Sequence, residues 1–120
     1  MTMKRSRKVL NRKVVFTADG NFAIHVTDLK KAENFYTDVL GFRLLKKAEG
    51  RLVYNTGKIT LYVVKDDTII PFIPALQVES YKSAKEHLTK NGCKIVREWP
   101  GDKALYFEDP FGIMIDIVEK

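Results

Sequence analysis

The chain has 120 residues, 45% of them hydrophobic and 30% charged, which is ordinary for one globular domain with its own core. It carries no apolar run long enough to cross a bilayer or to serve as a secretory signal, so we expect no membrane partner and a cytoplasmic location. The single cysteine, Cys93, excludes an internal disulfide. The net charge of +6 lies entirely in residues 1–13, because the rest of the chain holds 15 basic and 15 acidic residues.

Residues 1–20 are therefore predicted to form a basic N-terminal arm or strand that ends in a turn at Asp19-Gly20. Such an arm either docks on nucleic acid or another anionic surface, or is a solvated, frayed terminus. Aromatic side chains that stack on bases do not alternate with these charges, so the pattern favours the solvated terminus over a nucleic-acid partner.

Residues 21–66 are predicted to form a strand, a helix and three further strands. In residues 21–26, the apolar side chains of Phe22, Ile24 and Val26 alternate with those of Asn21, Ala23 and His25, which places the two sets on opposite faces of a strand. Thr27 or Asp28 can cap the helix that follows, and Gly41 can end it. Strands are expected at 42–46, 51–55 and 59–64.

Residues 71–120 repeat this order after a polar connector that runs from Lys65 to Pro71. A strand is predicted at 72–78, although Pro74 argues for an edge strand or a strand end. A helix then starts after Ser80 and ends at Gly92, and strands are expected at 94–99, 104–108 and 113–118. A duplicated ferredoxin-like unit is the alternative, but it would place a helix before its final strand, so the repeat favours two βαβββ modules.

Two segments carry a resemblance to a known family. Residues 26–42 (VTDLKKAENFYTDVLGF) resemble the first-module signature of the vicinal oxygen chelate superfamily, which includes glyoxalases, bleomycin-resistance proteins and extradiol dioxygenases. Residues 108–117 (EDPFGIMIDI) resemble the family's terminal D-P-x-G motif and last strand. The resemblance implies an α+β fold in which residues 21–120 form one domain of two βαβββ modules, 21–66 and 71–120. Together the modules would make a cupped mixed sheet around a cleft.

The resemblance also identifies four positions that hold metal ligands in metal-dependent relatives. They fall here on Asn21, Tyr62, Ile73 and Asp116, of which only Asp116 is a good ligand for a divalent cation. A catalytic metal is held by about three strong protein ligands and keeps an open position. We therefore expect no metal and no cofactor, while a divalent ion in a reorganised site stays open as an alternative.

The side chains expected to face the cleft are the candidate ligand-binding residues: Asn21, His25, Tyr62, Gln77, Met114 and Asp116. His25 is also the candidate catalytic residue, either as a base oriented by Asp116 or as a displaced metal ligand. The alternative for His25 is a hydrogen bond across the sheet or shielding by a dimer partner, and for Gln77 and Met114 it is simple packing. Trp99 would either stack on a planar ligand or cover the edge of the core.

The expected function is that of a metal-free small-molecule binding protein of the bleomycin-resistance type, with an unidentified ligand. The alternative is an enzyme: a glyoxalase-like lyase or isomerase with a reorganised metal or histidine-based site, or a dioxygenase relative. A third hypothesis is an interaction domain whose basic arm docks on nucleic acid. The resemblance further implies a homodimer, in which the cleft lies either within one chain or across two.

Overall fold

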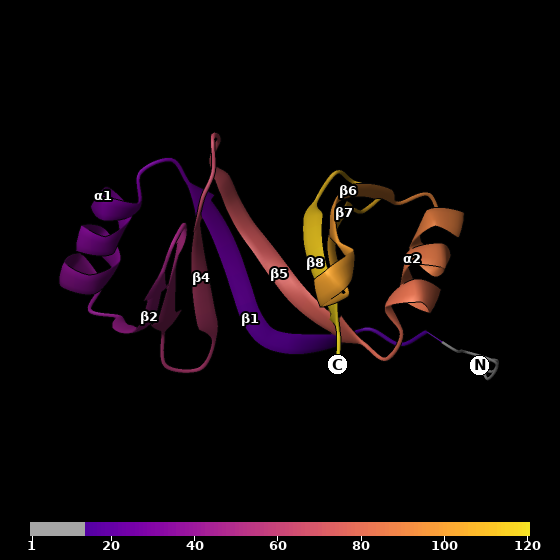
Figure 1. Cartoon of the computed structure of the whole chain (residues 1–120), viewed down its shortest axis with the longest axis horizontal. Helices are drawn as coiled ribbons and strands as arrows, with labels where there is room; N and C mark the ends of the chain where they lie inside the picture. The colour runs from indigo at the N-terminus through magenta and orange to yellow at the C-terminus, as the bar shows by residue number, and fades with distance from the viewer. Residues whose placement is uncertain (1–13) are drawn as a thin grey trace, which may run out of the picture.

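A computed structural model describes residues 14–120, so the basic residues of the predicted arm lie outside the described part of the chain. One curved, eight-stranded mixed sheet runs through the molecule in the order β2-β3-β4-β1-β5-β8-β7-β6. The helices α1 and α2 lie at opposite ends of the long axis, outside the sheet (Figure 1). Within residues 14–120, no helix is long and apolar enough to cross a membrane.

The elements follow the predicted order, with most bounds within two residues of those expected. They are β1 (Thr17–Val26), α1 (Leu29–Glu33), the π-helix η2 (Asn34–Val39), β2 (Arg43–Ala48), β3 (Arg51–Asn55), β4 (Thr60–Lys65), β5 (Ile70–Val78), α2 (Tyr81–Lys90), β6 (Lys94–Trp99), the 3₁₀ helix η3 (Pro100–Asp102), β7 (Ala104–Glu108) and β8 (Met114–Glu119).

The two halves have the same topology, which confirms the predicted βαβββ repeat. In each half the first strand pairs in parallel with the last, β1 with β4 and β5 with β8, and the other pairs are antiparallel. The first strands of the two halves, β1 and β5, then pair antiparallel at the centre of the sheet. This central pair joins the two halves into one sheet.

Each half buries its own core between its helix and the convex face of the sheet. In the first half, Phe22, Ile24 and Val26 pack with α1 residues against the buried side chains of Ala32, Leu52, Tyr54, Leu61 and Val63. In the second half, the buried set is Val78, Ala84, Leu88, Leu105, Phe107 and Ile117. Because side chains alternate along each strand, the remaining faces of β1 and β5 are left for the concave side.

The predicted helix ends are confirmed. The carboxylate of Asp28 accepts a hydrogen bond from the Lys31 amide (3.0 Å), and the hydroxyl of Ser80 accepts one from the Ser83 amide (3.1 Å), so both residues are N-caps. Gly92 ends α2 with a φ of +84°, a conformation that residues with a Cβ rarely adopt. The first helix differs from expectation in widening into a π-helix from Asn34.

Two predictions about the central strands were wrong. Asp19-Gly20 is not a turn but a part of β1, where the register with β5 shifts between Ala18 and Phe22, as in a β-bulge. Pro74 lies within β5, a central strand, instead of at an edge. It is tolerated there because pairing between β5 and β8 begins only at Ala75, and because Pro74 lies opposite Phe22, where the shifted register resumes.

Candidate functional site

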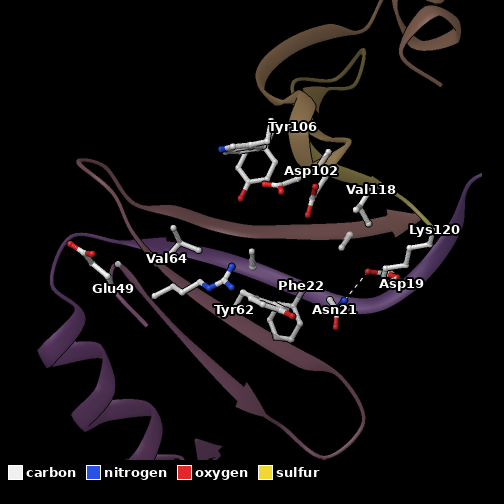
Figure 2. Close-up of a pocket in the computed structure, with 17 residues that line it drawn as sticks. Asp19, Asn21, Phe22, Glu49, Tyr62, Val64, Asp102, Tyr106, Val118 and Lys120 are labelled. Carbon is white, nitrogen blue, oxygen red and sulfur yellow. Dashed lines mark hydrogen bonds and ion pairs between the residues drawn. The ribbon is translucent and has the colours of Figure 1, made fainter. Parts of the chain in front are cut away.

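The concave side of the sheet holds a cleft of about 510 Å³. Its walls come from both halves of the chain, and β1 and β5 run between them (Figure 2). Small side chains, Ala23, Ala75 and Ala104, leave room in its interior. Cavities of this size with mixed apolar and polar walls are typical of small-molecule sites.

Four aromatic side chains line the cleft, one of them Phe22 in β1. Trp99 and Tyr106 meet edge-on with ring centroids 4.9 Å apart, and Trp99 stays 39% exposed. Tyr62 lies in β4 of the other half, and the guanidinium of Arg51 is 5.7 Å from its ring centroid, within cation–π distance. A planar molecule between the two halves would therefore meet aromatic surface on both sides.

One end of the cleft is polar. Asn21 donates a hydrogen bond to Asp19 (2.7 Å), and the ammonium of Lys120 pairs with the other oxygen of the Asp19 carboxylate (2.7 Å; Figure 2). Asp116 lines the same cleft, and burial, with a smaller contribution from the Asp19 charge, raises its pKa to about 7. Because its pKa is raised this far, Asp116 can carry a proton near neutral pH and can then donate as well as accept a hydrogen bond.

His25 is 1% exposed and is hydrogen-bonded at both ring nitrogens. Its Nδ1 lies 2.7 Å from an oxygen of Asp66, and its Nε2 lies 3.0 Å from the hydroxyl of Tyr106. The prediction that Asp116 orients His25 is therefore wrong. Asp66, which directly follows β4, is the carboxylate that contacts Nδ1 of His25. His25 does not itself line the cleft but contacts a residue that does, Tyr106.

Asp66 connects this histidine to the second half of the chain. The same carboxylate oxygen that contacts His25 also accepts a hydrogen bond from Arg97 (2.9 Å). The hydrogen bond from His25, with a smaller one from Arg97, holds the pKa of Asp66 well below its usual range. Burial raises the pKa of Tyr106 to about 12, so Tyr106 keeps its proton at neutral pH.

The structure brings three of the six candidate ligand-binding residues to the cleft: Asn21, Tyr62 and Asp116. The other three, His25, Gln77 and Met114, are not among the lining residues. Met114 packs beside the buried cluster of Ala23, Ile73 and Tyr106, and Gln77 is half-buried in β5 between Thr17 and Val118. For Gln77 and Met114, the alternative of simple packing fits this placement.

The residues at the four positions that hold metal ligands in metal-dependent relatives do not suit a metal ion here. Ile73 is fully buried against Ala23 and Tyr106 and offers no donor atom. Tyr62 would have to lose its phenolic proton, which leaves Asp116 and the neutral amide oxygen of Asn21. Across residues 14–120, no three His, Cys, Asp or Glu side chains are grouped so that they would hold an ion.

Several residues at the site were not predicted from the sequence: Asp19, Arg51, Asp66, Tyr106 and Lys120. Tyr106 could have been found, because it lies opposite Asp116 on the neighbouring strand once β7 and β8 are aligned as a hairpin. Asp66 gave no such signal, since it lies in a connector whose path depends on the curvature of the whole sheet.

Comparison with known proteins agrees with this architecture. Residues 20–117 match the sequence profile of the Glyoxalase/Bleomycin resistance protein/Dioxygenase superfamily. The chain belongs to this superfamily. One similar protein is a probable lactoylglutathione lyase from Synechocystis sp., 29% identical in an alignment that covers 80% of this chain and 90% of the relative.

Solved structures share the fold. Homoprotocatechuate 2,3-dioxygenase from Brevibacterium fuscum, solved in several variants, aligns with a TM-score of 0.67 at 23% identity over 88% of this chain. The chain spans only 33% of the length of that dioxygenase. A hypothetical protein from Bacillus halodurans aligns with a TM-score of 0.64 at 17% identity, over 88% of this chain and 94% of its own.

Proposed function

We propose that this superfamily member binds a small planar molecule in its cleft without the help of a metal ion. The observation that carries the proposal is Ile73, a fully buried apolar side chain at one of the four positions where metal-dependent relatives hold a ligand. At another position of the same set, burial raises the pKa of Asp116 to about 7, which makes this carboxyl group a weaker ligand for a cation near neutral pH. Both features suit an organic ligand better than a cation.

The walls of the cleft indicate what kind of ligand fits. Tyr62 on one side, and Tyr106 with Trp99 on the other, offer flat apolar surfaces to a ring. Arg51 beside Tyr62 offers a positive charge, and Asp116 and Asn21 offer hydrogen bonds at the polar end. A ring compound with polar or anionic substituents satisfies all of these groups.

Trp99 provides the experiment, because it is the single tryptophan of the chain and lies at the cleft. We expect ring compounds from a fragment set to quench or shift its fluorescence with saturation, and the binding constant to be unchanged when a chelator is present. Binding that disappears with the chelator and returns with a divalent ion would overturn the proposal.

A matched pair of variants locates the binding. Ala75 lines the cleft, so A75L should fill the site and weaken binding at least tenfold, a loss of about 1.4 kcal/mol. Ala48 lies at the end of the edge strand β2 and does not line the cleft, so A48L should bind like the parent chain. Equal effects of the two substitutions would place the ligand elsewhere.

A second candidate is a metal-free lyase or isomerase. It is favoured by the contact between buried His25 and Tyr106, which connects an imidazole to the cleft. Such an enzyme would catalyse exchange of carbon-bound hydrogen next to a carbonyl group, which NMR in deuterated water detects. If no compound in a panel of ring-bearing carbonyl compounds shows exchange, the enzyme candidate is contradicted and the binding function remains.

We also propose that the protein is a homodimer. The π-helix η2 and its C-cap, Leu40, expose an apolar set that a second copy would cover: Phe35, Val39 and Leu40. Light scattering coupled to size-exclusion chromatography should give twice the chain mass of 13.8 kDa. A monomer at micromolar concentration would contradict this.

A further inference from the structure

Asp66, His25 and Tyr106 form a hydrogen-bonded series that begins in the connector after β4 and ends in the cleft. The two distances are 2.7 Å from Asp66 to His25 Nδ1 and 3.0 Å from His25 Nε2 to the Tyr106 hydroxyl. The histidine is 1% exposed, and Arg97 holds the same Asp66 oxygen at 2.9 Å. Only the tyrosine reaches the cleft.

The partners set the direction of the protons in this series. Asp66 is ionised and can only accept, so Nδ1 of His25 carries the hydrogen that points to it. In the neutral imidazole, Nε2 is then an acceptor, and the Tyr106 hydroxyl donates to it. The lone pairs of the Tyr106 oxygen are left for another donor, which a ligand in the cleft can supply.

We propose, on the basis of the small-molecule cleft proposed above, that its ligand is a ring compound with an acidic hydroxyl group whose proton passes to the Tyr106–His25–Asp66 series. The ring lies between the aromatic walls, and its hydroxyl donates to the Tyr106 oxygen. The protein thus binds the ligand as an anion.

The transfer is balanced in protons and charge. The O–H bond of the ligand breaks and its proton bonds to the Tyr106 oxygen, while the former Tyr106 proton bonds to Nε2 of His25. The products are a ligand anion and an imidazolium whose Nδ1–H faces the Asp66 carboxylate at 2.7 Å. Tyr106 relays the proton and stays neutral, consistent with a pKa raised to about 12 by burial.

Of the charged groups around Tyr106, some favour an anionic ligand and others oppose it. Arg97 in β6 and Asp66 lie on the histidine side, and Asp116 faces Tyr106 from the neighbouring strand β8. An ionised Asp116 opposes a ligand anion, whereas Arg51, which lines the cleft above Tyr62, favours one. The cation formed at His25 is the charge nearest to the Tyr106 hydroxyl. Replacing His25 should therefore change the pKa of the bound ligand more than replacing any of the other charged residues.

The probe for this inference is 4-nitrophenol, whose neutral and ionised forms have different colours. Its binding is followed by quenching of Trp99, and its ionisation is followed by absorbance of the bound probe across pH. We expect the pKa of the bound probe to fall by about one to three units below that of the free probe. In H25Q, which fills the site with a side chain that cannot take the proton, that shift should be lost while quenching remains.

Two further variants complete the test. Y106F removes only the relaying hydroxyl and should abolish the shift, so it carries the test if H25Q does not fold. R51M removes the positive charge beside Tyr62 and should leave most of the shift in place. A shift that persists in Y106F or H25Q, or that is lost only in R51M, overturns the inference. Absence of Trp99 quenching in the parent chain by this probe and by every other ring compound counts against the proposed function instead.

Discussion

The hydroxyl of Tyr106 lies 3.0 Å from Nε2 of His25, although 81 residues separate the two in the sequence. His25 is in β1, and Tyr106 is in β7, with β5 and β8 between them in the sheet. The contact is possible because the sheet curves (Figure 1), which brings residues of these non-adjacent strands within hydrogen-bonding distance. It connects a buried histidine of the first half to the cleft wall of the second.

Replacing His25 should destabilise the fold. H25A leaves the Tyr106 hydroxyl and the Asp66 carboxylate without their buried partner, which should lower the free energy of unfolding by about 2–4 kcal/mol. The other histidine, His87, is exposed on α2, and H87A should change stability by less than about 0.5 kcal/mol. Urea denaturation of both variants measures the difference. Equal stabilities would show that the series contributes nothing to the fold.

Asp116 should make the fold less stable as the pH rises. Its pKa is about 7 in the folded chain and near 3.8 when exposed, so between these values the folded state holds the extra proton. The contribution of Asp116 to stability is therefore lost progressively as the pH rises through this window. It is constant below about pH 4 and again well above pH 7.

The variant D116N removes this titration and isolates its effect. The free energy of unfolding of D116N minus that of the parent chain should be larger at about pH 8 than at about pH 5, by roughly 1–3 kcal/mol. Denaturant titrations at the two pH values give this difference directly. A difference that is independent of pH would mean that Asp116 is ionised throughout.

Histidines in place of Asn21 and Ile73 should create a metal site. Asn21 and Ile73 lie on paired strands with Asp116 nearby, so N21H/I73H would supply three strong ligands. We expect the double variant to bind one Zn²⁺ per chain by isothermal titration calorimetry, and I73H alone to bind much more weakly. If the double variant gains no affinity, these positions do not converge as the sheet register indicates.

Cys93 should react slowly with alkylating reagents. Burial, with a smaller contribution from Asp109, raises the pKa of its thiol, and the thiolate is the reactive form. Alkylation by iodoacetamide at neutral pH should be at least several-fold slower than in the urea-unfolded chain. Equal rates would contradict the placement of this thiol.

The fold could be predicted because it depends on local patterns. Alternation in residues 21–26 assigned Phe22 and His25 to opposite faces, and the caps at Asp28 and Ser80 marked the helix starts. The prediction for Pro74 was wrong because a proline in a strand is costly only where its missing N–H would have bonded to a neighbouring strand. Which strand pairs at that point is a property of the assembled sheet.

The site could be predicted only in part, for a similar reason. Asn21, Tyr62 and Asp116 reached the cleft because strand parity decides which way they point. The partner of His25 could not be found that way. Asp66 is 41 residues away in the sequence, and the curvature of the sheet brings the two side chains together. Arg51 and Lys120 reach the cleft with long side chains, whose direction strand parity does not fix.

Native mass spectrometry of the purified protein, mixed with ring-compound fragments and a slight excess of Zn²⁺, distinguishes a metal-free ligand site from a metal site. A metal-free small-molecule site predicts chains that carry one organic molecule and no stoichiometric zinc, with the organic adduct weakened in A75L. A mass increase of one zinc per chain, lost in D116N and required before any fragment binds, would contradict it.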